Sequence, residues 1–481
     1  MTLVRTLPFL MMALLTALAA MLRFDGLYGQ DAHEYLRQSR ALCGRLSGQA
    51  WMPEGLGEAD FAGGYPLAGA LLQVLGVEAM AAMQAVSVLS AGAVLWLFER
   101  LLRLLTPGTV QRSRLLYAAL PLALSPMLLR SGLVVMSDAL GLALAMAALW
   151  QGLWALEPRQ AKAAVWAAAL AVMAITTRFA LAALLLPLAA AVVARLAQRR
   201  QWRGLALAAV AASAAALPHF WLKNGIETAF LQHALLRDWS LAHFFQSTFD
   251  TPSGTLRYTL PNGLYLLLPL VHPAFCLVLP GLFFLAKRTD THLFPKKVLL
   301  ACLALYLLLL GGLPHQNLRY LLPAYIVVLL LLFPAWDRMV AYGSYFFPRL
   351  TRGILAAMLA VQLASAAFFF QPTLARHRLE TALAAELRPL LPPGTTLFAF
   401  DVDVALCSYL PDIQFKNLWQ RRYAYHDLAG QLLLFNEPAL REQWAGQNPM
   451  LNWEFAQQNF HLRPLRQLPS GWTLYRAEPL F

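Results

Sequence analysis

The segment RFDGLYGQDAHEYL, residues 23–36, is a polar and acidic stretch that directly follows the first hydrophobic run of the chain. Its acids Asp31 and Glu34 are spaced i, i+3, so they share one face if the segment is helical. Both carboxylates would then point into one cavity at a membrane surface, and Tyr35 would line it. The alternative is a pair of solvated loop acids. The rest of the chain is interpreted as the housing of this cavity.

The composition is that of a polytopic membrane protein. The chain has 481 residues, of which 59% are hydrophobic and 13% charged, and its mean hydropathy is +0.54. Its formal net charge is +13, but the basic residues sit in short clusters between apolar runs and form no single basic face. A nucleic-acid partner is therefore not expected, and the clusters are interpreted as topology signals.

Apolar runs about as long as a membrane crossing recur along the chain and predict about eleven transmembrane helices. They span residues 6–22, 79–98, 115–130, 132–153, 163–178, 180–195, 204–218, 263–286, 298–313, 320–336 and 353–370.

Alternate loops between these runs carry most of the Lys and Arg residues, which marks them as the inner side. With Arg5 inside, the acidic loop 23–78, the loop 219–262 and the C-terminal tail would lie outside, which in a bacterium is the periplasm. Residues 1–371 are thus a transmembrane domain. Residues 372–481 combine an amphipathic helical pattern with alternating strands, which predicts a small external α/β domain.

Arg178 and Arg319 stand at outer ends of apolar runs, where the positive-inside rule disfavours cations. A permanently charged, fork-shaped donor at that depth suits a lipid phosphate. The alternative is an arginine that snorkels to the interface. Lys223 and Arg257, on the loop 219–262, are weaker candidates for the same phosphate.

Asp138 lies inside an apolar run, where an ionisable group usually faces a polar cavity or a partner. A hydrogen bond between helices is the alternative. Tyr65, at the start of a short apolar helix, and the external His315 are further cavity-lining candidates. The histidines lack the ligand spacing of a zinc or calcium site, so no metal is expected. The sequence permits a disulfide between Cys43 and Cys407 but does not decide whether it forms.

Several of these features together resemble the glycosyltransferase C (GT-C) superfamily. They are the acidic loop after the first run, Tyr-Pro-Leu at 65–67, Thr177-Arg178, Arg-Tyr-Leu-Leu-Pro at 319–323 and the terminal α/β domain. The branch most similar in these features holds protein O-mannosyltransferases and lipid A aminoarabinose transferases. The family usually carries an adjacent acidic pair in this loop. Here the acids are separated, which leaves open whether Asp31 or Glu34 serves as the base.

The resemblance implies an inner-membrane enzyme that moves a sugar from a polyprenyl-phosphate carrier to an acceptor outside the membrane, with inversion and without a cofactor. Asp31 would be the catalytic carboxylate, and Arg319 with Tyr320 would belong to the donor site, with Arg178 as a further phosphate contact. The acceptor would be a lipid, a glycan or a protein. The alternatives are a transporter or flippase, against which the absence of an internal hydropathy repeat argues, and a polysaccharide polymerase or ligase.

Overall fold

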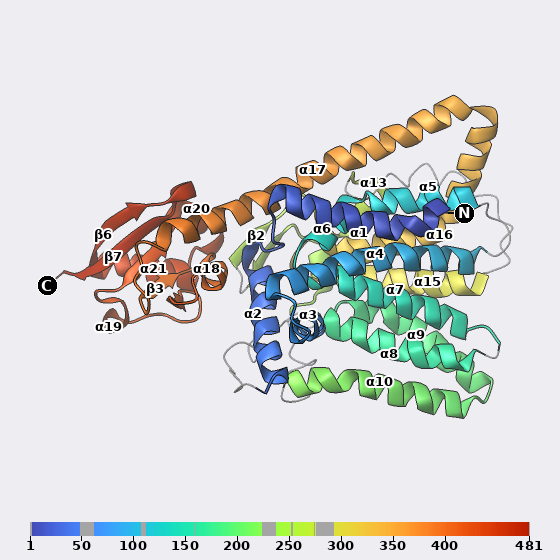
Figure 1. Cartoon of the computed structure of the whole chain (residues 1–481), viewed down its shortest axis with the longest axis horizontal. Helices are drawn as coiled ribbons and strands as arrows, with labels where there is room; N and C mark the ends of the chain where they lie inside the picture. Colours follow the sequence, from blue (N-terminus) through green and yellow to red (C-terminus); the bar gives the residue numbers. More distant parts are fainter. Residues whose placement is uncertain are drawn as a thin grey trace. The chain divides into compact units, whose positions relative to one another are not determined.

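The computed structural model describes residues 2–48, 62–106, 112–158, 160–223, 237–251, 254–273, 275 and 293–480 (Figure 1). The chain divides into two compact units. The first comprises residues 1–26, 38–246 and 260–370, and the second comprises residues 27–37, 247–259 and 371–481.

The first unit is a helical bundle. Its N-terminal half contains α1 (Thr2–Leu22), the second half of α2 (Gly29–Leu46), α3 (Gly64–Val74), α4 (Ala79–Leu105), α5 (Arg112–Ala123), α6 (Pro126–Leu133) and α7 (Ser137–Ala155). There follow α8 (Ala161–Thr177), α9 (Leu181–Gln198), α10 (Trp202–Lys223), η2 (Leu241–Phe245), α12 (Asn262–Tyr265), α13 (Leu268–Val271), α15 (Leu293–Gly311), η3 (Leu318–Leu321) and α16 (Leu322–Phe346). Within the bundle α7 packs on α4 and α8, α8 packs on α10, and α9 packs on α15 (Figure 1).

The prediction of a polytopic membrane protein is confirmed. Among the described residues, seven helices are long and apolar enough to cross a membrane. They are Ala79–Leu105, Ser137–Ala155, Leu181–Gln198, Trp202–Trp221, Phe294–Gly311, Leu318–Phe346 and Pro348–Leu387, and shorter apolar helices cover Thr6–Leu22, Ala161–Thr177 and Asn262–Val271. The run expected over 263–286 extends beyond the described residues.

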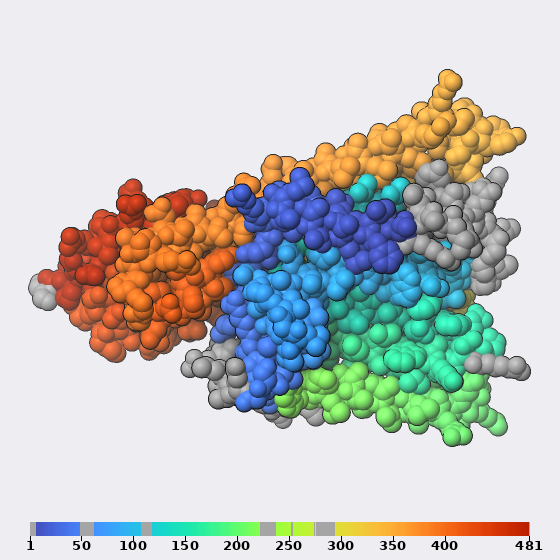
Figure 2. Space-filling model, in the orientation of Figure 1, coloured from blue at the N-terminus to red at the C-terminus, as the bar shows by residue number. Residues whose placement is uncertain are grey.

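The helix α10 carries exposed aliphatic side chains on the surface of the bundle. It lies at the edge of the first unit (Figure 2), and Leu207, Val210 and Leu217 are 59%, 65% and 64% exposed. A row of exposed aliphatic side chains of this length is unfavourable in water and favourable against lipid chains.

The run expected over 115–130 is not a single helix. It forms α5 and α6, which are separated at Leu124 and Ser125. Ser125 has an extended ψ of 123°, because a residue before proline, here Pro126, is excluded from the helical region. The next helix also begins later than the apolar pattern indicates, at Ser137. Asp138 therefore lies in the first turn of α7.

The second unit is built on a five-stranded sheet in the order β4-β3-β5-β7-β6. The strands are β3 (Thr396–Ala399), β4 (Gln414–Asn417), β5 (Leu432–Phe435), β6 (Phe460–Gln467) and β7 (Thr473–Pro479), and the helices are α18 (Asp403–Tyr409), α19 (Tyr425–Leu428), α20 (Glu437–Trp444) and α21 (Asn448–Asn459). β4, β3 and β5 are parallel, whereas β7 is antiparallel to β5 and β6. A hairpin of β1 (Thr248–Thr251) and β2 (Gly254–Arg257) packs on α20.

The central strand β5 separates two apolar cores. Leu432 and Leu434 belong to the core that includes Trp472, and Leu433 and Phe435 belong to the core that includes Trp453. This alternation follows from the two-residue repeat of a strand, and burial on both faces explains a strand without polar residues. The predicted small α/β domain is thus confirmed.

The last long helix, α17 (Pro348–Leu387), differs from the expectation of two separate helices. It continues through Pro372 into the amphipathic segment. A proline inside a helix costs about 3 kcal/mol. Ending one helix and starting another would leave four carbonyls and four N–H groups without helical partners. One uninterrupted helix is therefore the favoured solution.

Candidate active site

A buried ion pair joins two of the residues singled out from the sequence. Arg178 caps the C-terminus of α8 with an extended backbone, and its Nη1 contacts Oδ1 of Asp138 from the first turn of α7. The two side chains are only 10% and 6% exposed. Breaking such a pair costs about 3–5 kcal/mol, since one charge stays buried without its partner. Asp138 therefore holds Arg178 in place.

Tyr320 brings a second arginine to the same place. Its ring centroid lies 4.5 Å from Cζ of Arg178 and 5.3 Å from Cζ of Arg319. Both distances are within the range of cation–π attraction. Arg319 also donates from Nη1 to Sδ of Met136, at 3.1 Å, in the connection that leads into α7. Segments far apart in the sequence thus meet around one aromatic ring.

His315 completes this group. Its ring centroid is 5.3 Å from that of Tyr320. Burial, together with the positive charges of Arg319 and Arg178, lowers the pKa of His315 to about 4. The imidazole is therefore neutral at pH 7, and its Nε2 is buried without a hydrogen-bond partner among the described residues. The group formed by Asp138, Arg178, His315, Arg319 and Tyr320, here called the arginine cluster, carries a net charge of +1 from its two arginines and one aspartate.

The loop that carries His315 and Arg319 is held by polar residues that sequence reasoning missed. Asn262 donates from Nδ2 to the carbonyl of Leu313 at 2.6 Å, and the Tyr265 hydroxyl donates to the carbonyl of Asn317 at 2.6 Å. The Tyr306 hydroxyl donates to the backbone carbonyl of Tyr320 at 2.7 Å. The only signal in the sequence was a polar group within or beside an apolar run.

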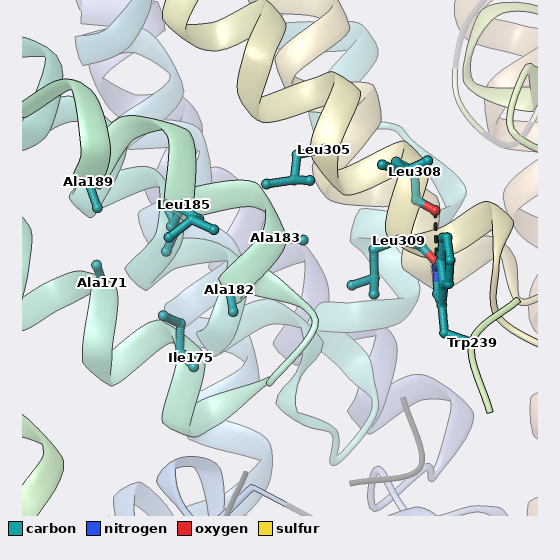
Figure 3. Close-up of a pocket in the computed structure, with 11 residues that line it drawn as sticks. Ala171, Ile175, Ala182, Ala183, Leu185, Ala189, Trp239, Leu305, Leu308 and Leu309 are labelled. Carbon is teal, nitrogen blue, oxygen red and sulfur yellow. Dashed lines mark hydrogen bonds between the residues drawn. The ribbon is translucent and has the colours of Figure 1, made fainter. Parts of the chain in front are cut away.

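A groove lined by apolar side chains runs along α8, α9 and α15 of the first unit (Figure 3). It has a volume of about 440 Å³. Trp239 borders it and donates its indole N–H to the carbonyl of Leu309 at 3.1 Å. Ile175 and Ala182, on either side of the α8–α9 turn, line the groove. Arg178 lies between these two residues in the sequence, in the connection from α8 to α9.

The acidic segment begins α2 in the second unit. Asp31 lies in the first helical turn and is half-buried. Glu34 follows on the same face, is 12% exposed and pairs with Arg37 at 2.8 Å, and Tyr35 is buried. The segment is therefore helical, which places the two acids on one face, and Arg37 forms an ion pair with Glu34.

No family model matches the chain, and no curated protein matches it. Among solved structures it is similar to ArnT from Cupriavidus metallidurans in the apo state, with a TM-score of 0.60 and 16% identity over 96% of this chain and 97% of that one. The same protein bound to undecaprenyl phosphate gives a TM-score of 0.60 and 14% identity over the same shares. The chain shares the fold of these two structures. At this identity the likeness shows the fold alone.

The remaining residues predicted from the sequence lie elsewhere in the fold. Tyr65, in α3, is fully buried, and its hydroxyl donates to the carbonyl of Met83 at 2.9 Å, so it fastens α3 to α4. Arg257, on β2 in the second unit, is exposed and lies 3.5 Å from Glu442. The side chain of Lys223 falls outside the described residues.

Proposed function

We propose that the protein is an integral membrane glycosyltransferase that moves a sugar from a polyprenyl-phosphate carrier to an acceptor on the outer face of the membrane. The observation that carries the proposal is that the first unit holds both the arginine cluster and an apolar groove between its helices. A lipid phosphate needs both features, a cationic site for its headgroup and an apolar surface for its chain.

The arginine cluster suits the phosphate of the donor. Its net positive charge attracts an anion, and guanidinium groups bind phosphate oxygens through parallel N–H donors. When the bond between sugar and phosphate breaks, negative charge grows on the departing phosphate. Positive groups already in place stabilise that charge. The two arginines supply the positive charge that a metal ion supplies in other transferases. We therefore expect sugar transfer to persist in the presence of the chelator EDTA.

The groove suits an isoprenoid chain. Its lining comes from alanine, leucine, isoleucine and tryptophan side chains of α8, α9, α15 and the segment before η2. The isoprenoid would enter sideways from the bilayer, since α9 and α15 are long and apolar enough to cross a membrane. The ArnT structure with undecaprenyl phosphate shows that a protein of this fold binds such a carrier.

Asp31 is the better candidate for the general base. Arg37 donates to both oxygens of Glu34, so a neighbouring cation already holds that carboxylate. Asp31 lies half-buried in the first turn of α2. A carboxylate hydrogen-bonded to an acceptor hydroxyl takes its proton as the oxygen attacks the anomeric carbon. The bond from that carbon to the phosphate oxygen breaks on the opposite face. The lipid phosphate leaves with both bonding electrons, and the anomeric centre is inverted.

The test uses the purified protein in liposomes with undecaprenyl-phosphate-linked hexoses and pentoses and with lipid, glycan and peptide acceptors. We expect transfer from at least one donor, a loss of at least about 100-fold in kcat for Asp31→Asn, and weaker undecaprenyl phosphate binding for Arg319→Ala. The exposed Arg352→Ala is the matched control. Movement of a sugar lipid across the bilayer without transfer, unaffected by Asp31→Asn, would favour a flippase instead.

A further inference from the structure

Glu380 is a carboxylate with no exposed surface near the end of α17, in the second unit. Its oxygens accept the backbone N–H of Gly29 at 2.9 and 3.2 Å and lie 3.3 Å from Nε2 of His33. Arg376 donates from Nε to the same carboxylate at 2.5 Å. A carboxylate removed from water is tolerated only with such donors. The side chain of Glu380 is therefore fixed in position by the residues around it.

The contact with Gly29 lies at the start of the helix that carries Asp31. The first N–H groups of a helix have no partner within it and are usually satisfied by a Ser, Thr, Asp or Asn side chain just before the helix. Here Tyr28 stands at that position, and Glu380 accepts the Gly29 N–H in its place. Its negative charge also suits the positive end of the helix dipole.

Neighbours of Glu380 on α17 hold the surrounding backbone. His377, one turn earlier, lies with Nδ1 3.0 Å from the carbonyl of Leu27. Arg376 donates to Oδ2 and to the carbonyl oxygen of Asp401, at 2.7 and 2.5 Å, just after β3. The turn that leads into α2 is thus fastened to the α/β domain through one face of a rigid helix.

We propose that Glu380 is a positioning residue that orients the first turn of α2, and Asp31 with it, for sugar transfer. The inference rests on the proposed function. Asp31 follows Gly29 by two residues, so a change in the start of the helix moves its carboxylate. A displacement of about 1 Å in a reacting group can lower a rate about 100-fold. Glu380 is buried, so it acts through α2 and does not touch the substrate.

The test compares Glu380→Ala and Glu380→Gln with Glu386→Ala in the full-length protein. Glu386 lies on the same helix, but its side chain is 46% exposed and lies 3.4 Å from Arg466. We expect Glu380→Ala to lower kcat about 100-fold while the Kd for undecaprenyl phosphate changes less than about twofold. Amide hydrogen exchange of residues 27–37 should become about tenfold faster or more. Glu380→Gln keeps an oxygen for the Gly29 N–H and should recover part of kcat, and Glu386→Ala should match the wild type.

Unchanged exchange of residues 27–37 in Glu380→Ala would overturn the positioning role. So would a loss of kcat accompanied by an equal loss of affinity for undecaprenyl phosphate. If the alanine variant does not fold, Glu380→Gln decides by the same two measurements. Absence of transfer by the wild-type protein would overturn the proposed function itself, whereas the exchange measurement would still decide whether Glu380 orders α2.

Discussion

The buried pair of Asp138 and Arg178 gives the first prediction at the residue scale. Asp138→Ala leaves a guanidinium buried beside Tyr320 without its carboxylate, so we expect a loss of about 3–5 kcal/mol in stability. The double variant Asp138→Ala/Arg178→Ala should lose less than the sum of the two single variants, because neither charge is then stranded. Unfolding of the detergent-solubilised protein measures both. Additive losses would show that the two side chains do not interact.

Asp403 gives the second prediction at the residue scale. Burial raises the pKa of its carboxyl from 3.8 to about 7, although Asn417 donates to it. Between these values the folded protein holds a proton that the unfolded chain has released. Stability therefore falls as pH rises through this range, by ~4 kcal/mol in total, and levels off above it.

The measurement is amide exchange of α18 in the full-length protein from pH 5 to 8, corrected for intrinsic rates. Protection should decrease with pH in the wild type and stay constant in Asp403→Asn, which carries no ionisable group. A pH dependence that persists in the variant would assign the effect to another residue.

At the scale of elements, α3 meets the end of α8 through Gly64. A Cβ at Gly64 would lie 2.4 Å from Oγ1 of Thr177 and 3.1 Å from the carbonyl oxygen of Thr176. The backbone of α8 must then shift just before Arg178. We expect Gly64→Ala to lower stability by about 1–3 kcal/mol and to weaken undecaprenyl phosphate binding.

The matched control is Gly353→Ala. This glycine lies in α17, and a Cβ there meets nothing within 4 Å. Alanine should therefore raise helix stability by up to about 1 kcal/mol. Equal effects of the two substitutions on lipid binding would mean that the α3–α8 contact does not support the arginine cluster.

At the scale of the whole molecule, the distribution of basic loops predicts that the α/β domain lies on the outer side of the membrane. Cys407 is exposed in this domain, Cys302 is buried in α15, and Cys43 is a free thiol. With Cys43 and Cys276 replaced by alanine, a membrane-impermeant maleimide applied to spheroplasts should label Cys407 without permeabilisation. Cys302 should stay unlabelled until the protein is denatured. Labelling of Cys407 only after permeabilisation would reverse the topology.

The candidate site shows which of its residues could be predicted from the sequence and which contacts could not. Arg178 and Arg319 stood out because cations are disfavoured at outer helix ends, and Asp138 because it is ionisable in an apolar run. These are local signals. The contact of both arginines with Tyr320 is not local, since it depends on how α7, α8 and η3 pack. Glu380 carried no signal, because a glutamate in an amphipathic helix is common.

The amino-acid sequence by itself determined the membrane-spanning class and the α/β character of the C-terminal segment. Each follows from the spacing of apolar residues, which acts over a few turns or strands. Only the tertiary structure decided that α17 continues through Pro372 and which polar groups share a buried site. Those outcomes depend on contacts between distant segments, where charges out of water must find partners that no local pattern specifies.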